Sequence, residues 1–246
     1  MIVVTAEQMR EMDRLTIQKY GTPSLTLMER AGAGVAQVIR ERFPEPASKG
    51  ILVVAGKGNN GGDGLVVGRL LREQGLSCEI ALLAKPNEIS RDAADNLKKY
   101  STAGGPVVDI DADHLALLHD SIAGKGLLVD AILGTGTKNE IRGIYADVIR
   151  AMNGSGLPIV AVDIPSGLDA DKGTPLGVGV QAAMTVALGY PKLGQVIYPA
   201  VRYVGELVVA DIGIEPAAVA EVAPAAELLA PEGIRPLVPV RKPDSH

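Results

Sequence analysis

The chain has 246 residues, with 24 Lys or Arg against 29 Asp or Glu, so its formal net charge at pH 7 is −5. The absence of a basic run and the low aromatic content (3%) argue against a nucleic-acid-binding surface. No apolar run approaches the ~20 residues that a membrane span needs, and the single cysteine, Cys78, cannot form an internal disulfide. These features favour one large α/β domain in a reducing cytoplasm, with no membrane contact.

Two helices are predicted in the first part of the chain. Thr5 and Gln8 have the spacing of a capping box, so a helix is expected from there to about Gly21. Residues 25–40 form a second predicted helix, and its apolar stripe has the spacing of a core-facing surface.

A strand, a glycine-rich loop and a helix follow at residues 51–74. The apolar run 51–55 predicts a buried strand, and a helix is expected to begin at Leu65. Between them, Gly56, Gly58 and Gly61 fit the G-x-G-x-x-G spacing, which lets a backbone approach a pyrophosphate. This spacing is a weak signal by itself.

The same loop carries polar side chains that phosphate binding does not require. They are Asn59, Asn60 and Asp63, which add amide donors and oxygens next to the glycines. The loop therefore predicts a ligand site that does more than hold a phosphate.

Strands and helices alternate through the rest of the chain to about residue 164. The predicted strands are 78–83, 107–109, 126–133, 157–164, 185–188 and 206–212, and the predicted helices are 90–100, 112–122 and 145–153. This alternation predicts a mainly parallel sheet with helices on both faces. The Ala-, Pro- and Glu-rich residues after 214 predict an exit segment or linker, so the domain is expected to span 1–214 and the linker 215–246.

Three predicted strands end in polar, glycine-bearing loops, at 56–64, 130–136 and 163–169. Ligands of open parallel sheets bind outside the carboxyl ends of the strands, so these loops are expected to converge. Asp130 and Asp163 lie within or at the end of apolar strands, where an ionised carboxylate is costly without a cation or several donors.

A metal ion held by oxygen ligands would offset the negative charge of these carboxylates. The Asn60 amide, the Asp130 carboxylate and the Ser166 hydroxyl would suit K⁺ better than Zn²⁺, which prefers His and Cys. The alternative for Asp130 is a cap that bonds a neighbouring loop N–H. The histidines are scattered and predict no zinc site.

Two further residues are candidates for catalysis. Asp163 sits at a strand tip and is a candidate acid/base, although an Asx turn would also explain it. Lys192 follows a later strand and could contact substrate or phosphate, or could be an ordinary solvated lysine.

The chain resembles the NAD(P)H-hydrate epimerase family over about residues 5–214. The matching motifs, in order, are LMERAG at 27–32, GKGNNGGDG at 56–64, DAILGTG at 130–136, RG at 142–143, DIPSGLD at 163–169 and PK at 191–192. Several ordered motifs with matching spacing are far more specific than the glycine pattern alone.

The resemblance implies a Rossmann-like three-layer αβα sandwich with a mainly parallel central sheet, often a homodimer, with K⁺ held by Asn60, Asp130 and Ser166. For the chemistry of such a site, Asp163 is the first candidate catalytic residue and Lys192 the second. The implied substrate-binding residues are Asn59, Asn60, Gly61, Gly62, Asp63, Gly134, Thr135, Gly136, Thr137, Lys138, Asn139, Glu140 and Asp163.

The activity that the resemblance implies is interconversion of the R and S epimers of C6-hydrated NADH and NADPH (NADHX and NADPHX). The S epimer is then consumed by an ATP- or ADP-dependent dehydratase, either separate or fused. Residues 238–246 resemble the junction that leads into such a dehydratase domain.

Two other functions are weighed against this one. A Rossmann dehydrogenase would need an acidic residue at the end of the second strand, where the sequence reads LLAK at 82–85. A non-catalytic nucleotide- or protein-binding module of the same fold would not need its aspartates, and they are present.

Overall fold

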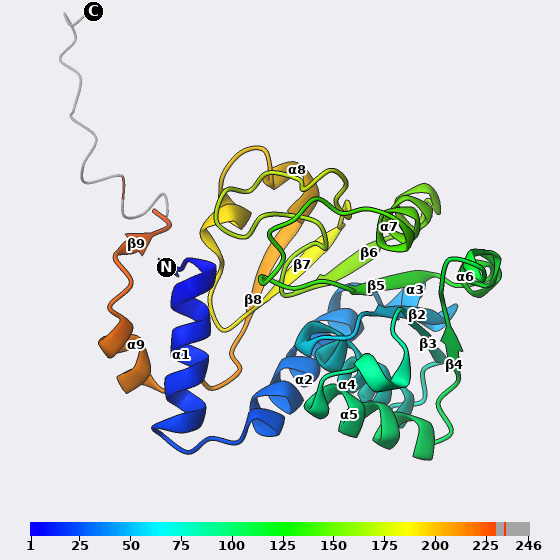
Figure 1. Cartoon of the computed structure of the whole chain (residues 1–246), viewed down its shortest axis with the longest axis horizontal. Coiled ribbons are helices and arrows are strands. Elements are labelled where there is room, and N and C mark those ends of the chain that lie inside the picture. The colour runs from blue at the N-terminus through cyan, green and yellow to red at the C-terminus, as the bar shows by residue number, and fades with distance from the viewer. Residues whose placement is uncertain (230–233, 235–246) are drawn as a thin grey trace, which may run out of the picture.

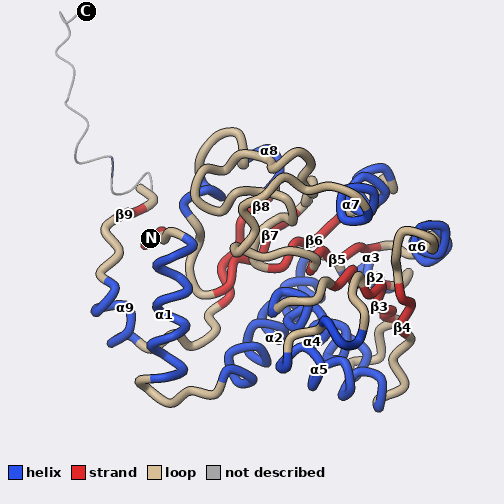
Figure 2. The backbone as a smooth tube through the Cα atoms, in the orientation of Figure 1, coloured by secondary structure: helices blue, strands red, loops and turns tan. Residues whose placement is uncertain are grey.

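The computed structural model describes residues 1–229 and 234, and it contains a parallel sheet of seven strands (Figures 1 and 2). In spatial order the strands are β4 (Val107–Asp109), β3 (Cys78–Leu82), β2 (Ile51–Ala55), β5 (Leu127–Ala131), β6 (Ile159–Val162), β7 (Met184–Leu188) and β8 (Glu206–Ala210). Each neighbouring pair in this sheet is parallel. The predicted α/β class and parallel sheet are confirmed.

Helices cover both faces of the sheet, so the molecule has three layers (Figure 1). The helices are α1 (Ala6–Gln18), α2 (Ser24–Arg42), α3 (Pro44–Ser48), α4 (Asn59–Glu73), α5 (Arg91–Thr102), α6 (Leu115–Ile122), α7 (Ile144–Gly154), α8 (Val201–Val204) and α9 (Pro216–Val222). In β2, Ile51 and Val53 join the core beneath α2, α4 and α5, whereas Leu52 and Val54 join a second core with α6 and α7. A strand buried on both faces is apolar at every position, as this one is.

The strand order reverses direction next to β2. The chain moves from β2 through β3 to β4, and then returns to the other side of β2 with β5 and continues to β8. The loops after β2 and β5 therefore part at the carboxyl edge of the sheet. This switch point is where doubly wound sheets bind their ligands.

Helix α4 begins at Asn59, so the predicted start at Leu65 is wrong. Glycine is a poor helix former, so the glycine-rich residues 56–64 predict a loop. The structure gives these glycines a packing reason: a Cβ on Gly61 would lie 1.9 Å from the Gly56 carbonyl oxygen, and one on Gly64 would lie 2.4 Å from the Ala131 Cβ. The loop is consequently short, and its polar residues belong to the first turns of α4.

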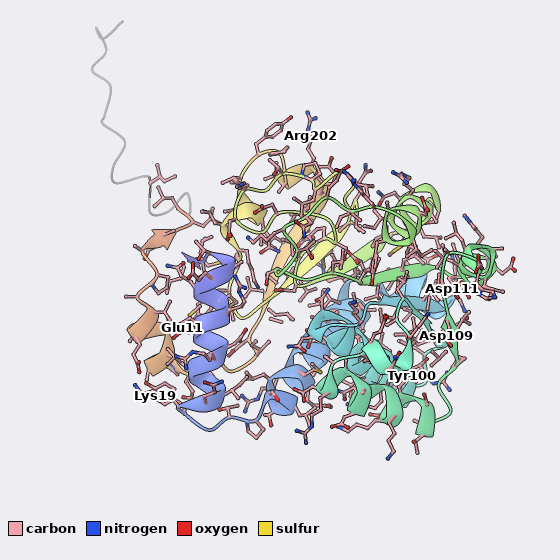
Figure 3. All side chains as sticks on the ribbon, in the orientation of Figure 1. Glu11, Lys19, Tyr100, Asp109, Asp111 and Arg202 are labelled. Atoms are coloured by element: carbon pink, nitrogen blue, oxygen red, sulfur yellow. The ribbon has the colours of Figure 1, made fainter. Side chains whose placement is uncertain are left out.

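The ends of the described chain pack against each other. The capping box on α1 is confirmed, because Thr5 and Gln8 exchange the two side-chain hydrogen bonds. Strand β1 (Ile2–Val3) pairs antiparallel with β9 (Ala226–Glu227), and α9 lies along α1 (Figure 1). Lys19, labelled at the end of α1 in Figure 3, pairs with Glu221 of α9 at 2.6 Å.

Residues 215–229 thus fold back on α1 as an arm, which we call the α9 arm. The domain boundary at 214 stays a prediction. The expected junction at 238–246 lies outside the described residues. Within 1–229 and 234, no helix is both long and apolar enough to cross a bilayer.

Candidate active site

A cavity of about 470 Å³ lies at the carboxyl edge of the sheet. Its walls come from α1, α2, the start of α4 and the segments after β2, β5, β6, β7 and β8, with one residue each from α5 and α7. The predicted site residues that line it are Asn59, Asn60, Asp63, Gly134, Thr135, Gly136, Thr137, Asp163 and Lys192. The three loops that were expected to converge therefore do so.

Other predicted site residues do not line this cavity. Lys138 pairs with Asp171 at 2.9 Å, and Glu140 pairs with Arg142 at 2.6 Å on the exposed surface. Asn139 is exposed. The remaining four, Gly61, Gly62, Asp130 and Ser166, are buried next to or behind the loops that form the walls. The binding roles of all these residues stay predictions.

Asp163 and Lys192 form an ion pair in the cavity. The Lys192 side chain is 1% exposed and that of Asp163 is 15% exposed, so the pair is shielded from solvent except on the cavity side. The Lys192 ammonium also donates to the Leu188 carbonyl at 3.0 Å, and the Leu188 amide donates to Asp163 Oδ1 at 3.2 Å. The solvated-lysine alternative for Lys192 is wrong.

The backbone at both members of the pair is held by specific contacts. Asp163 has φ of 66°, a left-handed conformation that Asp tolerates better than most residues. Gln195 Nε2 donates to the Asp163 carbonyl at 2.7 Å, and the Lys192 amide donates to Gln195 Oε1 at 2.7 Å. Val4 bonds the chain on each side of Lys192, accepting from Leu193 at 2.8 Å and donating to Pro191 at 2.9 Å.

Two more carboxyl groups face the same cavity, Asp63 from α4 and Asp13 from α1. Burial raises the pKa of Asp13 to about 6; the charge of Lys192 opposes this rise and that of Asp163 adds to it. Burial, aided by the charges of Asp163 and Asp13, raises the pKa of Asp63 well above its ordinary value. Asp13, Asp63 and Asp163 therefore line the cavity with one buried ammonium group, that of Lys192, which is bonded to Asp163.

Asp130 and Ser166 are bonded to each other across two of the loops. The Ser166 hydroxyl donates to Asp130 Oδ1 at 2.6 Å, and the Ser166 amide donates to Oδ2 at 2.7 Å. The Leu133 amide donates to the Ser166 hydroxyl oxygen at 2.8 Å. Burial raises the pKa of Asp130 to about 6, with the bonds from Ser166 opposing the rise. The capping alternative for Asp130 thus describes real contacts, which do not exclude ion binding.

Asn60 is the unexplained polar group of the site. Both its amide nitrogen and its amide oxygen are buried, and neither has a hydrogen-bond partner in the described part of the chain. Its Cβ lies 3.3 Å from where a Cβ on Gly134 would stand, so Asn60 packs against the loop that Ser166 bonds. A buried amide without partners is costly. A hard cation held by amide, carboxylate and hydroxyl oxygens would fit this donor set.

Histidine, cysteine and carboxylate clusters give no competing metal site. Among the described residues, no group of three or more such side chains is placed to hold an ion. His114 is exposed and bonds Asp111 at 2.7 Å.

Sequence reasoning missed the contribution of α1 to the cavity. Met9, Arg10, Asp13 and Ile17 line it, and none of them belongs to the polar loops that the glycine pattern marked. The available signal was Asp13 itself, which stands four residues after the buried Met9 and beside the buried Met12. A carboxylate next to an apolar stripe more often lies in solvent, so this signal is weak.

The sheet is parallel and doubly wound, and a cavity lies at its switch point. An uncapped helix N-terminus and a buried acid–lysine pair border this cavity. Together these features define a Rossmann-like protein with an enzyme-like site. Residues 24–194 match the family described as YjeF-related protein N-terminus, and the chain belongs to that family.

Two named relatives match most of this chain in sequence. It is 42% identical over 248 residues to the bifunctional NAD(P)H-hydrate repair enzyme Nnr of Moorella thermoacetica, a match that covers 100% of this chain and 47% of that protein. It is 40% identical over 208 residues to the NAD(P)H-hydrate epimerase of Limosilactobacillus fermentum, covering 85% of this chain and 95% of that protein. The chain therefore spans about half the length of the bifunctional relatives.

A solved structure shares the fold. The crystal structure of the yeast protein ynu0 superposes with a TM-score of 0.77 at 25% identity, covering 92% of this chain and 96% of that chain. The three-layer sandwich inferred from the resemblance is confirmed.

Proposed function

We propose that this chain is an NAD(P)H-hydrate epimerase, which interconverts the R and S epimers of NADHX and NADPHX. The observation that carries the proposal is the Asp163–Lys192 pair. It is buried at the wall of the cavity, at the carboxyl edge of the sheet where proteins of this topology bind their ligands. Relatives of about the same length bear this activity in their names.

The chemistry of the substrate requires proton movement at one hydroxyl group. Carbon C6 bears this hydroxyl beside the ring nitrogen N1, so the configuration inverts either by ring opening and reclosure or by loss and return of water. In the ring-opening route Asp163 would take the hydroxyl proton and later return it; in the water-loss route the same carboxyl group would give a proton to the departing hydroxyl and take one from the returning water. Lys192 would hold the Asp163 side chain in place at the cavity wall.

The dinucleotide part of the substrate would use the start of α4. Gly58 stands at the N-cap and supplies no side-chain hydrogen bond, which leaves the first-turn amides free for pyrophosphate oxygens. Asn59 and the loop Gly134–Thr137 line the cavity beside it. The free amides and the cavity-lining residues support the proposed substrate-binding site.

K⁺ is part of the proposal, with Asn60, Asp130 and Ser166 as its protein ligands. The partnerless amide of Asn60 and the buried carboxylate of Asp130 support it. The ion, when bound, would offset the negative charge of Asp130 and add positive potential near the substrate.

We also propose a homodimer in the cytoplasm, working with an ATP- or ADP-dependent dehydratase that consumes the S epimer. The dehydratase would be fused or separate. The bifunctional relatives, of which this chain matches about half, support the functional link.

The direct test uses the purified chain, R-NADPHX and a separate dehydratase specific for the S epimer. We expect the chain to accelerate loss of the R epimer above its spontaneous rate, and more so with K⁺ than with tetramethylammonium. If the R epimer decays at the spontaneous rate in both salts, the chain is a non-catalytic binding module of this fold.

A further inference from the structure

The cavity holds more acid than its one buried ammonium group can neutralise. Asp13, Asp63 and Asp163 face it from α1, from α4 and from the segment after β6, and Lys192 is bonded to Asp163 alone among them. Asp63 is 9% exposed, and within the described residues neither it nor Asp13 has a hydrogen bond or an ion pair to its carboxyl group. Ionised carboxylates without partners are costly in such a place, so burial favours the protonated forms of Asp13 and Asp63.

We propose that Asp13 is a second catalytic residue, a carboxylic acid that protonates the ring nitrogen of the substrate while Asp163 removes the hydroxyl proton. This assignment rests on the proposed epimerase function. It gives α1, which sequence reasoning left out of the site, a chemical role.

The reaction balances with these two groups alone. Asp163 takes the proton of the C6 hydroxyl, the oxygen forms a carbonyl with C6, the C6–N1 bond breaks with its electron pair on N1, and Asp13 gives its proton to N1. Rotation about C5–C6 then presents the other face of the aldehyde. N1 attacks that face, its proton returns to Asp13, and Asp163 returns its proton to the oxygen.

Asp13 suits this role better than Asp63. The same group must give a proton in the opening step and recover it in the closing step, which works best when its pKa lies near the operating pH. Burial raises the pKa of Asp13 to about 6, and Asp13 is only partly buried at the cavity wall, whereas Asp63 is 9% exposed. Asp13 is therefore the more accessible of the two to a substrate in the cavity.

The charged groups around Asp13 are consistent with an acid. The charges of Lys192 and Asp163 act on Asp13, and Asp63 lines the same cavity. On the same helix, Arg10 donates to the Ala6 carbonyl at 3.2 Å, toward the start of α1. The other titratable or charged residues that line the cavity are Lys57, Asp92 and Tyr145. Lys192, which would favour the ionised form of Asp13, is already bonded to Asp163.

The test is the pH profile of R-epimer consumption for wild type, Asp13→Asn and Asp13→Glu, with saturating dehydratase. We expect wild-type activity to fall as pH rises through an apparent pKa near 6. Asp13→Asn should lose ~10²–10⁴-fold in kcat and lose this limb of the profile, and Asp13→Glu should recover part of the rate with the limb present.

Glu11→Gln is the matched control, because Glu11 lies on the same helix, exposed and bonded to Arg14. It should leave both rate and profile unchanged, and circular dichroism would check that each variant is folded. A folded Asp13→Asn enzyme with the wild-type rate and profile overturns the role of Asp13 and leaves the epimerase function standing. Absence of catalysis in wild type overturns the function itself.

Discussion

The ammonium group of Lys192 is buried and pairs with Asp163, a residue whose backbone is held in the left-handed conformation at φ 66°. A buried charge pair on an unusual backbone is expected where geometry serves chemistry. The contacts of Gln195 and Val4 around it show that several elements fix this one pair.

Replacing Asp163 by Asn should abolish most of the activity without unfolding the chain. Asn accepts the left-handed backbone and keeps a carbonyl oxygen for Lys192 and the Leu188 amide, but it cannot take a proton. We expect kcat to fall ~10²–10⁴-fold with the dinucleotide still bound. Single-turnover kinetics and equilibrium binding of NADPHX measure the two effects, and full activity would remove Asp163 from its role.

Asp13 should make stability depend on pH. Its pKa rises from an unfolded value near 3.8 to about 6 on folding, so the native state holds the proton more tightly. The resulting stabilisation is present at low pH and is lost as pH rises through 6, by roughly 3 kcal/mol for about two pKa units.

The check is urea unfolding of Asp13→Asn and wild type across this pH range. The variant should gain stability relative to wild type as pH rises from about 4 to above 6. Glu11→Gln, whose parent carboxyl has its pKa lowered by Arg14, should not show this gain. Parallel curves for wild type and Asp13→Asn would contradict the prediction.

Asn60→Ala should separate ion binding from folding. The Asn60 amide has no protein partner within the described residues, so its removal should leave stability in tetramethylammonium chloride unchanged or raised. In KCl, wild type should gain stability, about 2.7 kcal/mol at a hundredfold excess over Kd, and the variant should gain none. Melting temperatures in the two salts measure this, and an equal K⁺ response in both proteins would exclude Asn60 as a ligand.

The glycines at the start of α4 should differ sharply in their tolerance of alanine. At Gly61 a Cβ would lie 1.9 Å from the Gly56 carbonyl oxygen, whereas at Gly58 nothing lies within 4 Å. We expect Gly61→Ala to lower the free energy of unfolding by ~3 kcal/mol or more, and Gly58→Ala by less than about 1 kcal/mol. Thermal and urea unfolding compare them; similar losses in both would disprove the packing explanation.

The α9 arm should detach without unfolding the sheet. Ala218 is completely buried in α9 and Ala217 beside it is exposed, so Ala218→Glu and Ala217→Glu form a matched pair. The buried charge should release residues 215–229 from α1. Hydrogen exchange would then show lost protection in α9 with β2 and β5 still protected; unchanged protection in Ala218→Glu, or equal loss in Ala217→Glu, would contradict this.

The strands and the meeting of the three loops were predictable because they follow from local pattern and a general rule. Apolar runs such as 51–55 predict strands buried on both faces, and parallel topology places their carboxyl ends together. The Asp130–Ser166 contact, between residues 36 apart in the chain, follows from that rule.

The start of α4, the α9 arm and Asp13 were not predictable in the same way. Glycine's helix propensity is overridden where a neighbour such as the Gly56 carbonyl leaves no room for a Cβ. In α9 only Ala218 is fully buried, and Val219 and Val222 are partly buried, so the arm keeps the Ala-, Pro- and Glu-rich composition of a linker. Asp13 faces the cavity only because α1 packs outside the alternating strand–helix pattern.

The hydrogen bonds from Val4 to the chain on either side of Lys192 join segments that lie almost a whole domain apart in sequence. Pairings at such separation form late in folding, after local strand and helix contacts have reduced the entropy of closing so long a loop. Lys192 would therefore reach Asp163 only when the rest of the sheet is in place. A partly folded chain would carry the glycine-rich segment without a working acid–lysine pair, so ligand-binding capacity and catalytic capacity would be acquired at different moments of folding.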